Sequence, residues 1–131
     1  MAFAPHPFTL RQLQYVVAVA TTKSFRGAAT LCHVSQPSLS SQIAQVEGAL
    51  GVPLFERDRR GVLLTPAGTE LVERARLLLR DADDLVSTSQ QYADPLAGTL
   101  RLGFIPTISP YVLPDAAPLL RKTFPRLSLI Y

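Results

Sequence analysis

The sequence predicts a mainly α-helical chain that closes with the beginning of an α/β unit. Three observations support this fold class. Apolar residues recur at helical spacing through residues 10–50, and an apolar repeat of about 3.5 residues follows over residues 71–92. After residue 98 the pattern changes to that of a strand, a helix and a second strand.

The composition is that of a folded chain with unevenly distributed charge. Hydrophobic residues make up 47% of the 131 residues, which is enough for a packed core and argues against global disorder. Residues 1–65 carry six Lys or Arg against three acids, residues 66–94 three against six, and residues 95–131 four against one. A basic head followed by an acidic stretch favours a nucleic-acid contact followed by a solvated helix.

The cysteine content and the N-terminus indicate the cellular compartment. One cysteine, Cys32, allows no intrachain disulfide, so an oxidising compartment is not implied. Residues 1–7 lack the basic and apolar segments of a signal peptide, and we expect them to form a disordered tail. No apolar run approaches the ~18 residues that a membrane span needs. We therefore expect a cytoplasmic protein without a membrane partner.

Three helices are predicted before residue 52. Their expected spans are residues 9–21, 25–31 and 35–50. Each begins at a residue type that commonly caps helices, namely Thr9, Ser24 and Ser35. Pro37 fits the first turn of the third helix, where a missing N–H costs nothing, and Gly51 is a natural C-cap.

A β-hairpin is predicted between Pro53 and Thr65. Apolar residues stand at both ends of this stretch, and a charged, glycine-containing loop over residues 56–61 separates them. Three helices followed by a hairpin are the elements of a winged helix-turn-helix, in which the third helix enters the major groove of DNA. The predicted DNA-binding domain spans residues 8–65.

A long helix is predicted from Thr65-Pro66 to about Tyr92, ended by Asp94-Pro95 and Gly98. Its apolar repeat is formed by Leu71, Ala75, Leu78, Ala82 and Leu85, and it continues to residues 89 and 92. Such a repeat over three heptads is typical of a coiled-coil seam, so we expect a homodimer through residues 66–94. The alternative is an amphipathic helix packed on its own domain. At about 40 Å, however, the helix is too long for the N-terminal domain to cover.

The last segment, residues 95–131, has the pattern of an incomplete βαβ unit. A strand with Leu100, Leu102, Phe104 and Ile105, a helix over 110–124 and a strand over 127–131 are expected. The pattern stops in mid-unit, so we interpret it as the start of an α/β domain. Ile105, Ile108, Val112 and Leu113 would then have no sheet to cover them.

The third helix has one face for the core and another for a ligand. The core stripe is Leu39, Ile43, Val46 and Leu50. Short polar or small side chains lie opposite this stripe or near the first turn, and glutamine can pair with adenine while serine donates or accepts. The contact residues predicted on this helix are Gln36, Pro37, Ser38, Ser40, Ser41 and Gln45.

Positive charge stands on either side of this helix. No Lys or Arg occurs between Arg26 and Arg57. The flanking cations are Arg11, Lys23 and Arg26 before the helix and Arg57, Arg59 and Arg60 after it. This division fits phosphate contacts that position a protein and base contacts that specify a sequence. Taken singly, the polar face and the arginines are also what an ordinary solvated surface shows.

Residues 24–68 resemble the LysR-type transcriptional regulators of bacteria. The matching elements are the Ala28-Ala29 pair, VSQPSLSSQI, an altered LE-x-x-LG-x-x-LF-x-R pattern and LTPAG. Gly48 and Ala49 depart from the family, in which these positions are more often charged. The resemblance extends over about residues 8–95 and implies a regulator that binds an inverted-repeat operator as a dimer.

Within that family, the segments LCHVSQPSLSSQI and GTLRLGFIPTISPYVLPDAAPLLRKTFPRLSL are most similar to the hydrogen-peroxide-sensing branch. The similarity implies an activator related to oxidative-stress gene control, with its redox cysteines beyond Tyr131. The base-reading positions would be Gln36, Pro37, Ser40 and Ser41. Arg60 would enter the minor groove, and Thr65 would contact phosphate at the N-terminus of its helix.

The resemblance also implies partners. The last segment would be the truncated start of a periplasmic-binding-protein-like effector domain. A tetramer would form only with a complete effector domain, and RNA polymerase is a further candidate partner. The alternative function is an interaction module that forms heterodimers with a full-length regulator through the long helix.

Other residue types give no sign of catalysis. Cys32 and His33 are adjacent, but a zinc site needs three or four ligands, so we interpret Cys32 as a small core residue. We expect no metal, no cofactor and no enzyme activity.

Overall fold

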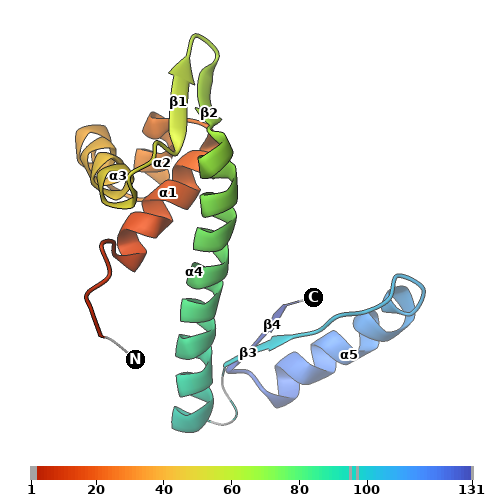
Figure 1. Ribbon diagram of the computed structural model, residues 1–131. Helices are drawn as coiled ribbons and strands as arrows, with labels where there is room; N and C mark the ends of the chain where they lie inside the picture. The colour runs from red at the N-terminus through yellow and green to blue at the C-terminus, as the bar shows by residue number, and fades with distance from the viewer. Residues whose placement is uncertain (1–2, 95, 97, 131) are drawn as a thin grey trace. The chain divides into compact units, whose positions relative to one another are not determined.

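The computed structural model describes residues 3–94, 96 and 98–130 (Figure 1). They fall into two compact units, of which the first ends at Arg80 and the second begins at Asp81. Helix α4 (Pro66–Ala93) contributes residues to both units. No helix within the described ranges is long and apolar enough to cross a lipid bilayer.

The first unit is built on three helices, α1 (Leu10–Thr22), α2 (Phe25–Leu31) and α3 (Gln36–Leu50). All three predicted helices and their caps are confirmed. The hydroxyl oxygens of Thr9, Ser24 and Ser35 accept the backbone N–H of the residue three positions later, at 3.1, 3.0 and 3.2 Å. Gly51 ends α3 with a φ of 76°, a left-handed conformation that glycine adopts at little cost.

The hairpin consists of β1 (Phe55–Asp58) and β2 (Gly61–Leu64), paired antiparallel. It projects beyond the helices and is called the wing from here on (Figure 1). The predicted charged loop over 56–61 is too long, because residues 56–58 belong to β1 and only Arg59 and Arg60 form the tip. A two-stranded ribbon leaves charged side chains in water, so their charge does not interrupt the strand. At the tip, Oδ1 of Asp58 accepts the N–H of Arg60 at 2.7 Å.

The core of the first unit lies between the three helices, the base of the wing and the start of α4. Its largest fully buried side chains are Leu39, Ile43, Leu54, Val16, Val19, Val46 and Val72. Three of the four predicted stripe residues of α3 are among them, and the fourth, Leu50, packs half-buried at the edge. Cys32 is 9% exposed within this core, which confirms its predicted structural position.

Leu54 joins three elements of the first unit through its backbone. Its N–H donates to Oε2 of Glu47 on α3 at 2.7 Å, and its carbonyl accepts the N–H of Thr65 at 3.0 Å. The Thr65 hydroxyl donates to the carbonyl of Pro53 at 2.7 Å and accepts the N–H of Gly68 at 2.9 Å. The first turn of α4 is thereby held against the segment that leads into the wing.

The second unit contains the end of α4, β3 (Gly98–Arg101), α5 (Ser109–Thr123) and β4 (Leu127–Ile130). The strands pair in parallel, which confirms the predicted β-α-β order. The predicted extension of the first strand to residue 105 is wrong. Its register with β4 covers only residues 98–101, Leu102 adds one N–H to the carbonyl of Ile130, and the chain then turns into α5.

Other predictions for this unit have mixed outcomes. Ile105, Ile108 and Val112 are exposed as predicted, whereas Leu113 is half-buried. The roles assigned to Pro95 and Tyr131 lie outside the described residues. The predicted domain boundaries after residues 65 and 94 stay a prediction.

We predict that Gly68→Ala destabilises the first unit by about 3 kcal/mol or more. A Cβ at this position would lie 2.0 Å from the carbonyl oxygen of Leu54, and the backbone on both sides is tied by hydrogen bonds. Gly48→Ala is the matched control, since a Cβ there meets nothing within 4 Å and should stabilise α3 by about 0.5–1 kcal/mol. Urea unfolding measures both, and equal effects would contradict the packing described at Gly68.

Candidate nucleic-acid interface

The outer face of α3 carries the residues predicted to contact DNA. Gln36, Pro37, Ser38, Ser41 and Gln45 are exposed, and Ser40 is half-buried. The buried stripe of the same helix turns this set outward, because residues three and four apart share a face. The face contains no charged side chain. Short side chains of this kind let a helix backbone approach base edges closely.

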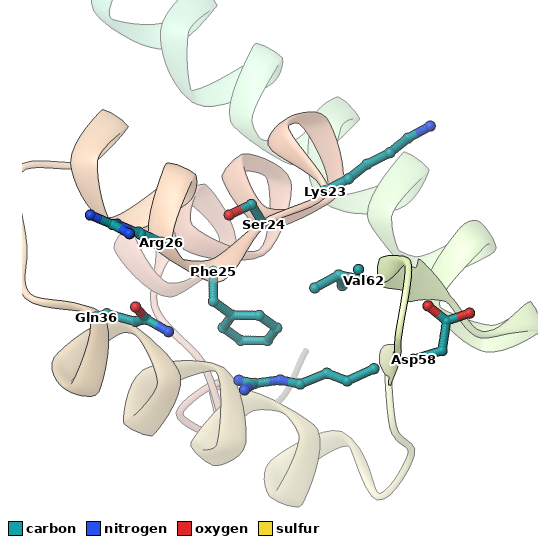
Figure 2. A pocket seen from close by; sticks show the side chains of 9 residues that line it. Lys23, Ser24, Phe25, Arg26, Gln36, Asp58 and Val62 are labelled. Atoms are coloured by element: carbon teal, nitrogen blue, oxygen red, sulfur yellow. The ribbon is translucent and has the colours of Figure 1, made fainter.

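An open hollow of about 300 Å³ lies where the N-terminal ends of α2 and α3 meet the wing. Figure 2 shows Arg26 and Gln36 on one side of it and Val62 and Asp58, from the wing, on the other. The structure therefore brings a predicted base-reading residue, Gln36, next to cations from two other elements. Lys23 and Arg57 also line this hollow.

Arg57 is held in place by an aromatic contact. Its guanidinium carbon lies 3.9 Å from the centre of the Phe25 ring, which is 8% exposed. The ring of Phe55 meets Phe25 edge-on at 6.0 Å between centres. A cation over an aromatic face keeps its charge, so Arg57 places a positive charge over Phe25, beside the hollow that Gln36 at the start of α3 also lines.

The remaining predicted cations divide into two groups. Arg59 and Arg60 lie at the exposed tip of the wing, outside the residues that line the hollow. Arg11 also has contacts within the protein: its guanidinium donates to the carbonyl of Cys32 at 2.9 Å and to Oε1 of Gln14 at 3.0 Å. Arg11 therefore ties α1 to the turn before α3, and its role as a flanking charge stays a prediction.

Thr65 is not free to make the predicted contact with phosphate. The residue is 6% exposed, and its hydroxyl both donates to Pro53 and accepts from Gly68. A phosphate oxygen would need the one O–H donor of Thr65, which is already used inside the protein, so Thr65 acts as a helix cap.

Two residues that support this face were not predicted from the sequence. Glu47 fixes the segment before the wing through Leu54. Gln12 on α1 donates from Nε2 to Oε1 of Gln42 at 2.9 Å and to Oε1 of Gln45 at 3.3 Å. The spacing of Thr9 and Gln12, a hydroxyl residue followed three positions later by glutamine, is the capping-box signal that would have drawn attention to Gln12.

The apolar repeat of α4 changes environment along the helix. Ala75 is 3% exposed and Leu71 is half-buried against the core of the first unit. Ala82 is half-buried, whereas Leu78 is 45% and Leu85 74% exposed. The first heptad thus packs on its own domain, as in the alternative interpretation of this helix, and the exposed leucines begin at residue 77.

Three helices, a wing beside the third of them, and an uncharged outer face bordered by arginines define a winged helix-turn-helix protein. The family described as bacterial regulatory helix-turn-helix protein, lysR family, matches residues 10–69. The BenM DNA-binding domain, solved in complex with catB site 1 DNA, is 40% identical with a TM-score of 0.64; the match covers 66% of this chain and 98% of that domain. The chain belongs to the LysR family.

Two matches extend beyond the DNA-binding domain. The DNA-binding transcriptional dual regulator OxyR of Escherichia coli K12 is 48% identical over 120 residues, which are 92% of this chain and 39% of that protein. A mutant OxyR of Corynebacterium glutamicum matches with a TM-score of 0.74 at 37% identity. The match covers 98% of this chain and 40% of that OxyR chain. The chain thus spans about two fifths of the length of these relatives, which are transcription regulators and not enzymes.

We predict that Arg57→Met loosens the wing and lowers the free energy of unfolding by about 1 kcal/mol. The substitution keeps an unbranched apolar stem and removes the cation that lies over the Phe25 ring. Arg59→Met is the matched control at the exposed tip, where a surface substitution should change stability by less than about 0.5 kcal/mol. Urea unfolding of the two variants checks the contact, and a loss at residue 59 as large as that at residue 57 would contradict it.

Proposed function

We propose that this chain binds double-stranded DNA in a sequence-specific manner, as the DNA-binding and dimerisation part of a LysR-type transcriptional regulator. The observation that carries the proposal is the outer face of α3, which is exposed, uncharged and bordered by cations from α2 and the wing. The BenM domain, of similar fold, was solved with DNA. An uncharged polar face can discriminate between base edges, while the surrounding arginines neutralise phosphates.

The proposed contacts follow from position on the fold. Gln36, Pro37, Ser40 and Ser41 would read bases from the first turns of α3, with Ser38 and Gln45 beside them. Arg26, Arg57 and Arg59 would contact phosphates, and Arg60 at the wing tip would reach the minor groove. Thr65 is not among the proposed contacts because its hydroxyl caps α4.

We further propose that α4 pairs two copies of the chain. Leu78 and Leu85 are spaced seven residues apart and are both exposed in one chain, so a second copy would bury them. Ala75 is already buried and offers a partner little surface. The α3 helices of the two copies, related by two-fold symmetry, would then bind an inverted-repeat operator. A tetramer would form only with a complete effector domain, and RNA polymerase in the cytoplasm is a further proposed partner.

The regulated genes are proposed from the relatives. Relatives 48% identical over 120 residues bear the name hydrogen peroxide-inducible genes activator, which supports a role related to oxidative stress. We do not assign peroxide sensing to either of the two units, because Cys32 is the single cysteine of the chain and is buried in the core of the first unit.

Gln36→Ala should lower the affinity for a preferred duplex far more than the affinity for random DNA. A lost bidentate base contact removes about 1–3 kcal/mol of discrimination. Arg59→Ala is the comparison: loss of its proposed phosphate contact should weaken binding to most duplexes and reduce the slope of log affinity against log salt by about 0.9. Fluorescence anisotropy on a duplex selected from a random library measures both, and equal losses of Gln36→Ala on both duplexes would refute the base-reading role.

Leu78→Glu and Leu85→Glu should each convert the dimer to monomers, because two charges would meet at the paired α4 helices. Gln91→Glu is the matched control, since it adds one negative charge at an exposed position away from the apolar repeat. Sedimentation velocity at a fixed concentration measures the association. A dimer that persists in both leucine variants would refute pairing through this helix.

A further inference from the structure

A chain of three glutamines connects the start of α1 to the outer face of α3. Oε1 of Gln12 accepts the backbone N–H of Thr9 at 2.9 Å. Its Nε2 donates to Oε1 of Gln42 at 2.9 Å and to Oε1 of Gln45 at 3.3 Å. Gln12 and Gln42 are half-buried between the helices, and Gln45 is exposed on the face proposed to meet DNA.

The directions of these hydrogen bonds follow from one atom that can only donate. The N–H of Thr9 is a donor, so the Gln12 atom facing it must be the carbonyl oxygen. The other end of the Gln12 amide is then the NH₂ group, which can only donate, and the Gln45 atom facing it must be an oxygen. The NH₂ group of Gln45 therefore points away from Gln12.

A glutamine whose oxygen is turned toward Gln12 presents its NH₂ group, a hydrogen-bond donor, to a ligand on the other side. Bidentate pairing with adenine needs both ends of the amide, the oxygen for N6 and the NH₂ group for N7. Guanine O6 and N7, thymine O4 and phosphate oxygens need only a donor. The expectation that a glutamine of this helix pairs with adenine thus fits Gln45 poorly.

We propose that Gln12 is a positioning residue that fixes Gln45 as a hydrogen-bond donor toward an acceptor atom of DNA. The acceptor is either a base edge or a phosphate oxygen. The inference rests on the proposed function, because it requires that α3 meets DNA. Gln12 itself makes no contact with DNA in this account and acts through Gln45.

Gln12→Glu tests the proposal with a minimal change of shape. A carboxylate keeps the acceptor for the N–H of Thr9 but offers no donor to α3, so Gln45 must turn its NH₂ group inward and its oxygen outward. Gln14→Glu is the matched control: it adds the same charge on the exposed side of α1, where Oε1 of Gln14 accepts from Arg11 and the carboxylate preserves that bond. The measurement is selection from a random duplex library, followed by anisotropy on selected and random duplexes.

The two acceptor sources give different results, and both support the proposal. With a base-edge acceptor, Gln12→Glu changes the preference at one base pair of each half-site toward a base that offers an amino group, by roughly tenfold. With a phosphate acceptor, it lowers affinity for all duplexes by roughly tenfold relative to Gln14→Glu and leaves base preference unchanged. In a Gln45→Ala background the difference between the two glutamate variants should disappear.

Gln45→Glu is a second variant that does not touch the α1 cap. Its carboxylate can still accept from Gln12 but has no outward donor, so it should bind DNA less well than Gln45→Ala. Indistinguishable behaviour of Gln12→Glu and Gln14→Glu, while Gln36→Ala still loses discrimination, would overturn the inference and leave the proposed function standing. A wild-type chain that enriches no duplex would overturn both.

Discussion

The geometry of the first unit depends on the backbone of Leu54. Its side chain lies in the core, its N–H is held by Glu47 at the end of α3, and its carbonyl receives the N–H of Thr65 at the start of α4. The carbonyl also lies so close to Gly68 that α4 has no room for a side chain there. One residue thus ties the end of α3, the segment before the wing and the first turn of α4 together.

Arginines in this unit serve two different purposes that their sequence positions do not distinguish. Arg11 uses its guanidinium to fix the turn before α3, whereas the guanidinium of Arg57 lies over the ring of Phe25. Arg59 and Arg60 lie exposed at the tip. Phe25, which also meets Phe55, places the charge of Arg57 near the start of α3, and the exposed tip supplies further charge.

Features governed by neighbouring residues were predictable from the sequence. The caps at Thr9, Ser24 and Ser35, the stripe of α3 and the wing depend on spacing over a few residues, and the structure shows each of them. The end of β3 and the buried state of Thr65 depend on partners 11 to 29 positions away, such as Pro53 and Ile130, so local patterns could not reveal them.

On the candidate face, too, some features depend on neighbouring residues and others on distant partners. Its exposed residues follow from helical periodicity, which is why Gln36, Ser41 and Gln45 were predicted together. Their orientation depends on contacts across the fold, as the link from Gln12 on α1 to Gln45 on α3 illustrates. The stacking of Arg57 on Phe25 likewise joins residues 32 positions apart and has no counterpart in the spacing of charges.

The absence of charge on the outer face of α3 has a kinetic consequence. If the proposed contacts form, diffusion along and between DNA molecules would depend on the arginines at the flanks, whose interactions weaken as salt is raised, so ionic strength would set how quickly the protein finds a site. The choice between two duplexes of equal length would depend on neutral hydrogen bonds instead, and their affinity ratio would change little with salt. A change in ionic strength would thus alter the rate at which the protein finds a site but not its preference between sites.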